Sequence, residues 1–423
     1  MVSQFGPSVS HKGPNRRQFQ PLRLAERHSA HPRDHPGMRH MPKNLVICCD
    51  GTANEFARDN TNVVKLFYTL VQDPARQAAY YHPGLGTMEP SGALTTVTRK
   101  ITKLLGKAVG YGLLSDIRDA YVYVMNMYEE GDRVFLFGFS RGAYTVRAVA
   151  SLLHMYGLMP VGNEALVPYG TRMLAAVNAA QSRRSPKSKG RSAVSSMFEL
   201  AGRFKATFCA RDCPVWFAGV WDTVSSVGWV ENPLRLPFTA SNAAIHIGRH
   251  AVSIDERRAF FRTNLWRPAA APAEGGPRDL KQVWFPGVHC DVGGGYPEAE
   301  SGLSKLALEW MIREAQQAGL LVDETKVGVV LGRAGAGECV PPDPQAMMHE
   351  SLKGFWYLAE FIPKRHYDQQ TDRSYYRPNL FRRRTFPSQP LVHESAFLRS
   401  PEYQRRLPAD AVRVVTASAA QGP

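Results

Sequence analysis

A serine flanked by two glycines is the most informative feature of this sequence. Residues Val134–Ala143 read Val-Phe-Leu-Phe-Gly-Phe-Ser-Arg-Gly-Ala, with an apolar run before Ser140 and an amphipathic run after it. This is the Gly-x-Ser-x-Gly pattern of a nucleophile elbow, a sharp turn between a strand and a helix that exposes the serine hydroxyl. The turn has no room for a side chain at Gly138 or Gly142. Ser140 is therefore a candidate nucleophile, and the alternative is an inert serine in a glycine-bounded turn.

Two further polar residues follow apolar runs and could activate this serine. A serine hydroxyl needs a histidine to take its proton, and the histidine needs a carboxylate to fix its tautomer. Asp222 follows the run Val215–Trp221, and His289 follows the run Gln282–Val288. The order Ser-Asp-His along the chain is that of α/β-hydrolases. We therefore predict Ser140, Asp222 and His289 as a catalytic triad.

Other residues compete for these roles. His393 is the alternative base if the last strand lies later in the chain, and Asp291 could replace Asp222 or bind substrate. Asp222 could also be a cap of the following turn, and His289 a histidine of a loop.

A developing oxyanion needs backbone N–H donors. One donor should be Arg141, the residue after the nucleophile. The second should be Gly51 or Thr52, in the turn after the first strand. Asp50 and Asn54 are expected to order that turn through their side chains.

Apolar strand patterns alternate with helical patterns along the chain, and hairpin signals are few. The strands are expected at 45–49, 79–82, 134–139, 215–221 and 282–288, and helices are expected from Thr61 or Asn62, around 117–128, from Ala143 and from Ser301. This alternation predicts an α/β fold, an α/β-hydrolase-like, doubly wound, mostly parallel sheet with insertions and a C-terminal extension. In such sheets ligands bind at the carboxyl ends of strands, where Asp50, Ser140, Asp222 and His289 all lie.

The remaining segments are divided by composition. Residues 1–42 are expected to be a disordered basic tail, and 43–336 a catalytic domain. Within it, 164–213 form a basic insertion and a candidate lid. Residues 337–423 are irregular and are expected to be a C-terminal extension or cap.

Charge and cysteine usage limit the partners. The 423-residue chain has a net charge of +15, and much of the excess lies in the tail, in Arg183–Arg191 and in Arg382–Arg384, which we interpret as solvated segments. The charge favours contact with an anionic lipid surface over nucleic acid, for which no binding module is present. Of the six cysteines, Cys48 and Cys49 are expected to be buried thiols. We expect no disulfide framework, metal or cofactor.

The sequence shows no segment suited to targeting. No apolar run has the length of a transmembrane helix, and no secretory signal peptide is recognised in residues 1–42. We expect synthesis in the cytoplasm, with export by a route that needs no cleaved signal left open, and the oligomeric state open as well.

Five ordered motifs support a family resemblance. They are Asp50-Gly-Thr-x-Asn54, Gly138-Phe-Ser-Arg-Gly142-Ala, Val220-Trp-Asp-Thr-Val224, Ala251-Val-Ser-Ile-Asp-Glu-Arg257 and Gly287-Val-His-x-Asp-Val-Gly-Gly-Gly-Tyr296. Together they resemble the α/β-hydrolase family that includes the phospholipase effectors of type VI secretion, over roughly residues 44–300. The resemblance implies a Ser-Asp-His triad at Ser140, Asp222 and His289. The acidic and basic residues of Asp255–Arg257 are interpreted as a surface ion pair without a catalytic role.

The predicted function is that of a serine esterase on lipid or phospholipid esters, working through an acyl-enzyme. The alternative is a catalytically silent binding or regulatory protein on the same fold. A phosphatase built on Cys48-Cys-Asp-Gly-Thr52 is disfavoured, because a cysteine stands where the nucleophilic aspartate of such enzymes would be.

Overall fold

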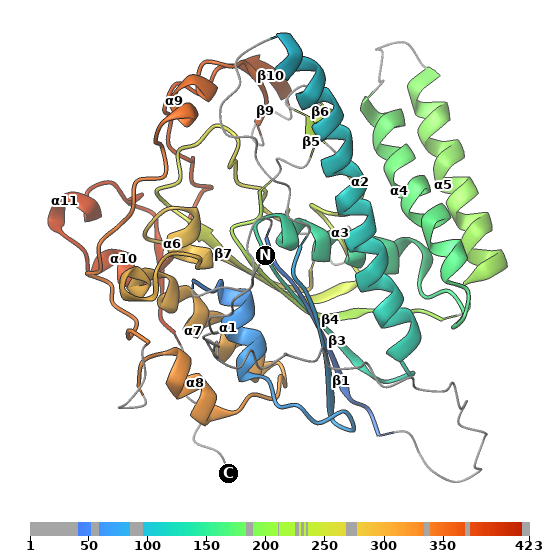
Figure 1. Ribbon diagram of the computed structural model, residues 1–423, viewed down its shortest axis with the longest axis horizontal. Helices are drawn as coiled ribbons and strands as arrows, with labels where there is room; N and C mark the ends of the chain where they lie inside the picture. Colours follow the sequence, from blue (N-terminus) through green and yellow to red (C-terminus); the bar gives the residue numbers. More distant parts are fainter. Residues whose placement is uncertain are drawn as a thin grey trace, which may run out of the picture. The chain divides into compact units, whose positions relative to one another are not determined.

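A parallel sheet forms the centre of the protein. The computed structural model describes residues 41–51, 59–84, 96–182, 189–209, 211–224, 228–229, 232–233, 236–267, 277–333, 339–368 and 373–416. The eight strands of the main sheet are all parallel to their neighbours (Figure 1). Their order across the sheet is β12 (Val412–Val414), β11 (Leu391–His393), β8 (Asp279–Phe285), β7 (Ile245–Ser253), β4 (Val215–Trp221), β3 (Arg133–Phe139), β1 (Asn44–Cys49) and β2 (Gln77–His82). The predicted doubly wound, mostly parallel sheet is confirmed.

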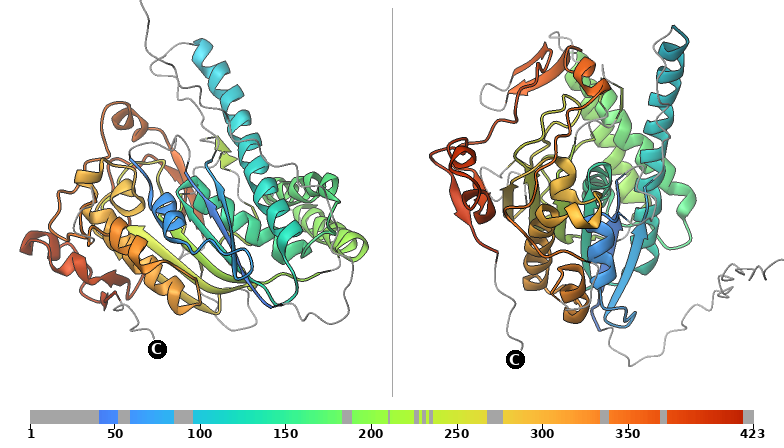
Figure 2. Two further views of the ribbon diagram at one scale, coloured as in Figure 1. Left: turned by 60° about the horizontal axis from the view of Figure 1, so that its bottom comes forward. Right: turned by 60° about the vertical axis from the view of Figure 1, so that its left-hand side comes forward.

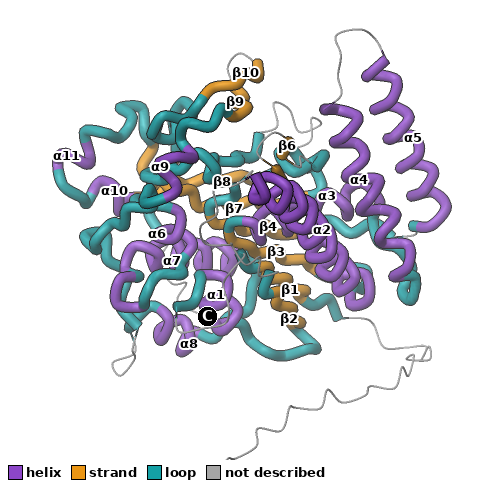
Figure 3. Tube along the Cα trace, turned by 45° about the horizontal axis from the view of Figure 1, so that its top comes forward, coloured by secondary structure: helices purple, strands orange, loops and turns teal. Residues whose placement is uncertain are grey.

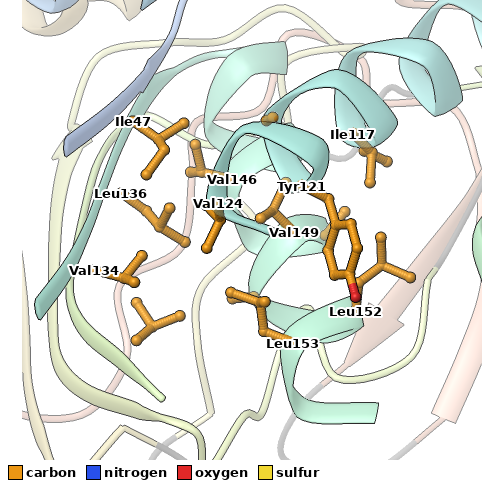
Figure 4. Close-up of a cluster of buried hydrophobic side chains, with 14 of the residues drawn as sticks. Ile47, Ile117, Tyr121, Val124, Val134, Leu136, Val146, Val149, Leu152 and Leu153 are labelled. Carbon is orange, nitrogen blue, oxygen red and sulfur yellow. The ribbon is translucent and has the colours of Figure 1, made fainter. Parts of the chain in front are cut away.

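Helices cover both faces of this sheet, which explains why its strands are apolar without alternation. Helices α2 (Thr96–Met127) and α3 (Arg141–Tyr156) lie on one face, and α1 (Asn62–Thr69), α7 (Gly302–Gln317) and α8 (Glu324–Val330) on the other (Figures 1 and 2). Successive side chains of β1 enter different cores: Leu45 and Ile47 pack with α2 and α3, whereas Val46 and Cys48 pack with α1 and α7. Figure 4 shows the first of these cores.

The strand order places the end of β3 where ligands bind in such folds. The chain runs from β1 to β2 at one edge and then crosses back, so that β3 pairs with the other side of β1. The adjacent carboxyl ends of β1 and β3 therefore form a topological switch point. Asp50 follows β1 and Ser140 follows β3 at this point.

The segment after α8 differs from the expectation of irregular structure. Strands β11 and β12 extend the main sheet, β9 (Lys364–Asp368) pairs with β10 (Arg373–Arg377), and α9 (Phe355–Ala359), α10 (Glu394–Phe397) and α11 (Pro401–Gln404) lie between strands. The prediction that 282–288 is the last clear strand was wrong, since β11 and β12 follow it in the chain and belong to the same sheet. They were missed because each has only three residues, too few to show a periodic pattern. Strand β7 was also missed. Met41–Pro423 forms one compact unit.

The insertion at 164–213 is mostly helical where it is described. After the short helix η1 (Glu164–Leu166), α4 (Val167–Ser182) and α5 (Lys189–Phe208) lie beside α2 and α3 (Figure 3). Leu174 and Ala201 are buried in the core shared with α2 and α3. A lid function of this segment stays a prediction. The predicted disordered tail and most of the Arg183–Arg191 run, which was predicted to be solvated, lie outside the described residues.

Replacing a side chain at the centre of the core shown in Figure 4 should lower stability strongly. Leu136 on β3 is fully buried, whereas Leu200 on α5 is 47% exposed. We expect Leu136→Ala to cost about 2–5 kcal/mol of unfolding free energy, through lost burial and the cavity left behind. Leu200→Ala should stay within about 0.5 kcal/mol. Urea unfolding of both variants and the wild type measures this, and equal midpoints for the two variants would contradict the assigned packing.

Candidate active site

Ser140 lies in a strained turn between β3 and α3. Its backbone has φ 56° and ψ −114°, a region that residues other than glycine rarely adopt. A Cβ on Gly138 would lie 2.5 Å from the Gly142 carbonyl oxygen, and one on Gly142 would lie 2.1 Å from the Cys49 carbonyl oxygen. Both flanking positions therefore require glycine, as the pattern predicts, and the turn has the geometry of a nucleophile elbow.

Asp222 and His289 are joined by a short hydrogen bond. Asp222 follows β4, and His289 is the first residue of α6 (His289–Gly293), which follows β8. His289 Nδ1 lies 2.6 Å from Asp222 Oδ2, and both side chains are buried. Because Phe139 on β3 pairs with Trp221 on β4, Ser140 and Asp222 leave the sheet side by side. The structure thus brings the predicted carboxylate and imidazole together, and Ser140 follows the strand next to that of Asp222.

The orientation of His289 is set by its neighbours. The ring centroid of Phe139 lies 4.6 Å from that of His289. The ring centroid of Phe261 lies 4.9 Å from it, with the two ring planes inclined at 71°. Since Asp222 accepts from Nδ1, Nε2 is the nitrogen that can accept a proton. Within the described part of the chain, neither His289 Nε2 nor the Ser140 hydroxyl has a hydrogen-bond partner. Hydrogen bonds of this kind are often long in the absence of substrate.

The charge of Asp222 is balanced by several donors. Its carboxylate accepts from the backbone N–H of Ser253 at 2.9 Å and from both terminal nitrogens of Arg384, at 2.5 and 3.0 Å. Burial would raise the pKa of Asp222, but the Arg384 charge and the hydrogen bond from His289 outweigh it and hold this pKa well below its usual range. Asp222 is therefore ionised at neutral pH.

Arg384 is a site residue that sequence reasoning missed. The run Arg382–Arg384 was expected to be solvated, which holds for Arg383, whose side chain is 51% exposed, but is wrong for Arg384, at 6%. The local sequence does not indicate which of the three consecutive arginines is buried, because all three have the same side chain. Only the tertiary path of the chain selects the third one.

The predicted oxyanion donors have different surroundings. The Arg141 N–H lies at the N-terminal end of α3, where the helix dipole favours negative charge. The Gly51 N–H donates to Asp50 Oδ1 at 2.6 Å, so in this structure it is engaged by a carboxylate. Thr52 and Asn54 lie outside the described residues. Arg141 at the start of α3 stays the predicted donor.

Asp50 and Asp291 hold neighbouring segments in place. The Asp50 carboxylate also accepts from the Thr61 hydroxyl at 2.7 Å and from the Tyr81 hydroxyl at 2.9 Å, and so ties together the ends of β1, β2 and α1. Asp291 accepts from the Val288 N–H at 3.0 Å and binds His349. These contacts agree with a site-shaping role for both carboxylates.

The alternative pairings considered from the sequence do not form. Asp291 Oδ1 lies 2.6 Å from His349 Nδ1, and His289 pairs with Asp222. His393 ends β11 and binds the hydroxyls of Ser395 and Thr416, each at 2.8 Å. The pair of His289 and Asp222 is the one next to Ser140.

The acidic residues after β7 are buried, contrary to the expectation of a surface ion pair. Asp255 accepts from the Gly287 N–H at 2.9 Å and from Tyr403 and Arg406, and Glu256 accepts from the His289 N–H at 3.2 Å. Arg257 does form an ion pair, with Glu350. Asp255 and Glu256 therefore fix the loop that begins α6 and carries His289.

The described residues contain neither a metal-binding cluster nor a membrane-spanning helix. No group of three or more His, Cys, Asp or Glu side chains in the described ranges is arranged to hold a metal ion, and the cysteines there are free thiols, with Cys48 and Cys49 buried. None of the described helices combines the length and apolar character needed to cross a membrane.

A family model gives the relationship of the chain. The model of the catalytic domain of Tle1-like phospholipase effectors of type VI secretion systems matches residues 43–314. The chain belongs to this family. The matched segment includes Ser140, Asp222 and His289, and it ends before Arg384.

Individual relatives are matched only in part. Uncharacterized protein YEL023C of Saccharomyces cerevisiae is 33% identical over 235 residues, which cover 53% of this chain and 33% of that protein. A crystal structure of an uncharacterized protein from Pseudomonas aeruginosa matches with a TM-score of 0.38 and 20% identity, over 67% of this chain and 46% of that one. The Tle1 effector bound to the VgrG spike of the type VI secretion system matches with a TM-score of 0.32 and 16% identity, over 63% and 53%. The chain thus spans between a third and about half of the length of these relatives.

The His349 contact predicts a pH-dependent contribution to stability. Its Nδ1 faces Asp291, and its Nε2 lies 2.8 Å from Glu300 Oε2. Burial lowers the pKa of His349, but the hydrogen bonds to these two carboxylates outweigh it, so the pKa is raised above its usual value. This stabilisation is complete below the pKa of an unfolded histidine and is lost as the pH rises through the raised pKa of His349. His349→Gln should therefore destabilise the protein more at pH 5.5 than at pH 9.

Thermal unfolding of the wild type and of His349→Gln at both pH values measures this difference. His246→Gln, which changes a histidine of β7 whose ring contacts Trp216, controls for the loss of a titrating group. A destabilisation by His349→Gln that is the same at both pH values would refute the assigned charge.

Proposed function

We propose that this chain is a serine hydrolase that cleaves carboxylic esters of lipids, above all of phospholipids. The observation that carries the proposal is the buried pair of His289 and Asp222 next to the strained turn at Ser140. Membership in a family of phospholipase effector domains supports a lipid substrate.

The proposed reaction uses the three side chains in turn. His289 Nε2 takes the proton of the Ser140 hydroxyl as its oxygen attacks the ester carbonyl, and Asp222 stabilises the imidazolium that forms. The Arg141 N–H donates to the oxyanion. Collapse expels the alcohol, which receives the proton from His289, and leaves an acyl ester on Ser140. Water, deprotonated by His289, then releases the carboxylic acid and restores Ser140.

Aromatic side chains beside His289 suit an acyl chain. Phe261 contacts the His289 ring, and Trp356 from α9 contacts Phe261 with ring centroids 5.5 Å apart. An apolar wall next to the base favours a hydrophobic acyl group over a polar one. Trp356 lies in the C-terminal extension, so this part of the chain contributes to the proposed substrate site.

A surface near these aromatic residues is suited to a lipid interface. Its exposed large apolar side chains are Tyr357, Leu358, Phe361, Ile362, Tyr375, Tyr376, Leu380 and Phe381, which we call the aromatic surface. The Phe381 ring contacts Tyr357 and Phe361 at 5.9 and 5.7 Å, so these members are contiguous. Exposed Arg382 and Arg383 follow directly. Aromatic and basic side chains together favour the headgroup region of an anionic membrane.

Removing the nucleophile should abolish ester hydrolysis. Ser140→Ala should lower turnover of a p-nitrophenyl ester by at least about 10³-fold, since a serine nucleophile cannot be replaced by the rest of the site. A fluorophosphonate probe should label the wild type at Ser140, with mass spectrometry locating the label. Ser151→Ala, which alters a buried serine of α3, serves as the control. It should retain ester turnover and labelling at Ser140.

The wild type is then incubated with mixed bacterial phospholipids, and mass spectrometry of the products shows which ester bond is cleaved. The silent alternative predicts equal residual rates for the wild type and Ser140→Ala and no labelling. That result would reject the hydrolase proposal.

The aromatic surface should govern binding to vesicles rather than the chemical step. Phe361→Ser with Tyr376→Ser should weaken sedimentation with phosphatidylglycerol-containing vesicles about tenfold or more, because each side chain loses apolar burial. Hydrolysis of a soluble ester should be unchanged. Tyr169→Ser, at an exposed tyrosine of α4, is the matched control. Unchanged vesicle binding by the double variant would count against this surface.

A further inference from the structure

Arg384 reaches the candidate active site from outside the family-matched segment. Its Nη1 and Nη2 donate to both oxygens of Asp222, and Nη1 also donates to the Ser253 hydroxyl at 2.7 Å. Nη2 donates to the carbonyl of Phe261 at 2.5 Å, the residue whose ring contacts His289. The guanidinium thus connects Asp222 to Phe261, so both of its partners contact the imidazole of His289.

We propose that Arg384 is a positioning residue of the proposed hydrolase: it fixes the orientation of the Asp222 carboxylate toward His289 and limits how strongly that carboxylate stabilises the protonated imidazole. The inference rests on the proposed function. A bidentate arginine fixes the plane of a carboxylate, which a lysine cannot do. Two cations that share one carboxylate also divide its charge, so a protonated imidazole at His289 would be stabilised less than by an unshared carboxylate.

The other charged groups around this pair are themselves neutralised. Glu256 accepts from the His289 backbone N–H, and its carboxylate pairs with Arg258 at 2.9 Å. Burial would raise the pKa of Glu256, but the hydrogen bond from Arg258 and its charge outweigh it and lower this pKa. Glu256 is therefore ionised near neutral pH and is paired with Arg258.

Two further titratable groups among the described residues near Asp222, His250 and Cys290, are neutral. His250 Nε2 accepts from the Thr223 N–H at 3.1 Å, and burial lowers the pKa of His250 to about 3. Burial raises the pKa of the Cys290 thiol to about 12. Neither group changes charge between pH 5 and 9, so neither contributes a titration step to the activity profile in that range.

The test compares pH profiles of kcat/KM for a soluble p-nitrophenyl ester. Arg384→Gln should lower kcat/KM by about 10- to 100-fold, the range seen when residues that orient metal ligands are removed. The acid limb of the profile should move to higher pH by about one unit, because the imidazolium then has the Asp222 charge to itself. Arg384→Lys should keep the acid limb near its wild-type position but lower kcat. Arg405→Gln, at an exposed arginine that follows α11, should change neither quantity.

A purely structural role would lower activity without moving the acid limb, so an unmoved limb in Arg384→Gln overturns the proposal. Should Arg384→Gln fail to fold, the Lys variant decides: unchanged kcat overturns the orienting role. Nitrogen-15 NMR of the His289 ring gives a readout that does not depend on turnover, and its titration midpoint should rise in Arg384→Gln. Should the wild type be inactive, the proposed function fails, whereas the NMR result still supports or rejects the coupling of Arg384 to His289.

Discussion

A carboxylate that has no contact with water is the constraint on which the candidate active site depends. An unpaired buried charge costs several kcal/mol, so Asp222 can be ionised only while its donors are in place. These donors come from β7 through the Ser253 N–H, from the start of α6 through His289, and from the C-terminal extension through Arg384. Three distant chain segments must therefore dock before the imidazole acquires a defined tautomer.

The parallel sheet supplies the rigidity that this docking requires. Ser140 and Asp222 both have positive φ, at 56° and 38°, which costs of order 1–3 kcal/mol for each residue. Each strained residue is held by the next strand: the Ser140 N–H donates to the Trp221 carbonyl at 3.1 Å, and the Asp222 N–H donates to the Ala251 carbonyl at 2.7 Å. The strain is thus maintained by a continuation of the β3–β4–β7 ladder beyond the regular strands, which explains how the serine and the carboxylate come to lie side by side.

Features that depend on local sequence could be predicted, whereas features that depend on contacts between distant segments could not. Strands such as β1 and β3 are continuous apolar runs and were found, as were the chemically useful residues at their ends. Strand β7 was missed because Arg249 and His250 interrupt it, and the Arg249 charge is compatible with burial only through Asp279 and Glu314, at 2.6 and 2.5 Å. These partners lie on other elements and leave no local pattern. Arg384 was missed for the same reason, since its function depends entirely on a contact 162 residues away in sequence.

The buried acidic residues that follow β4 and β7 have hydrogen-bond donors outside the segment matched by the family model. Asp222 binds Arg384, Asp255 binds Tyr403 at 2.6 Å, and Glu256 accepts from the Ser351 hydroxyl at 3.0 Å. All three partners lie beyond residue 314, where the family model ends. Without them, the same three carboxylates would be buried with fewer donors, which disfavours their charged form. The charge of the carboxylate next to His289 is therefore a property of the whole folded unit, and a motif match at Ser140, Asp222 and His289 does not by itself determine it.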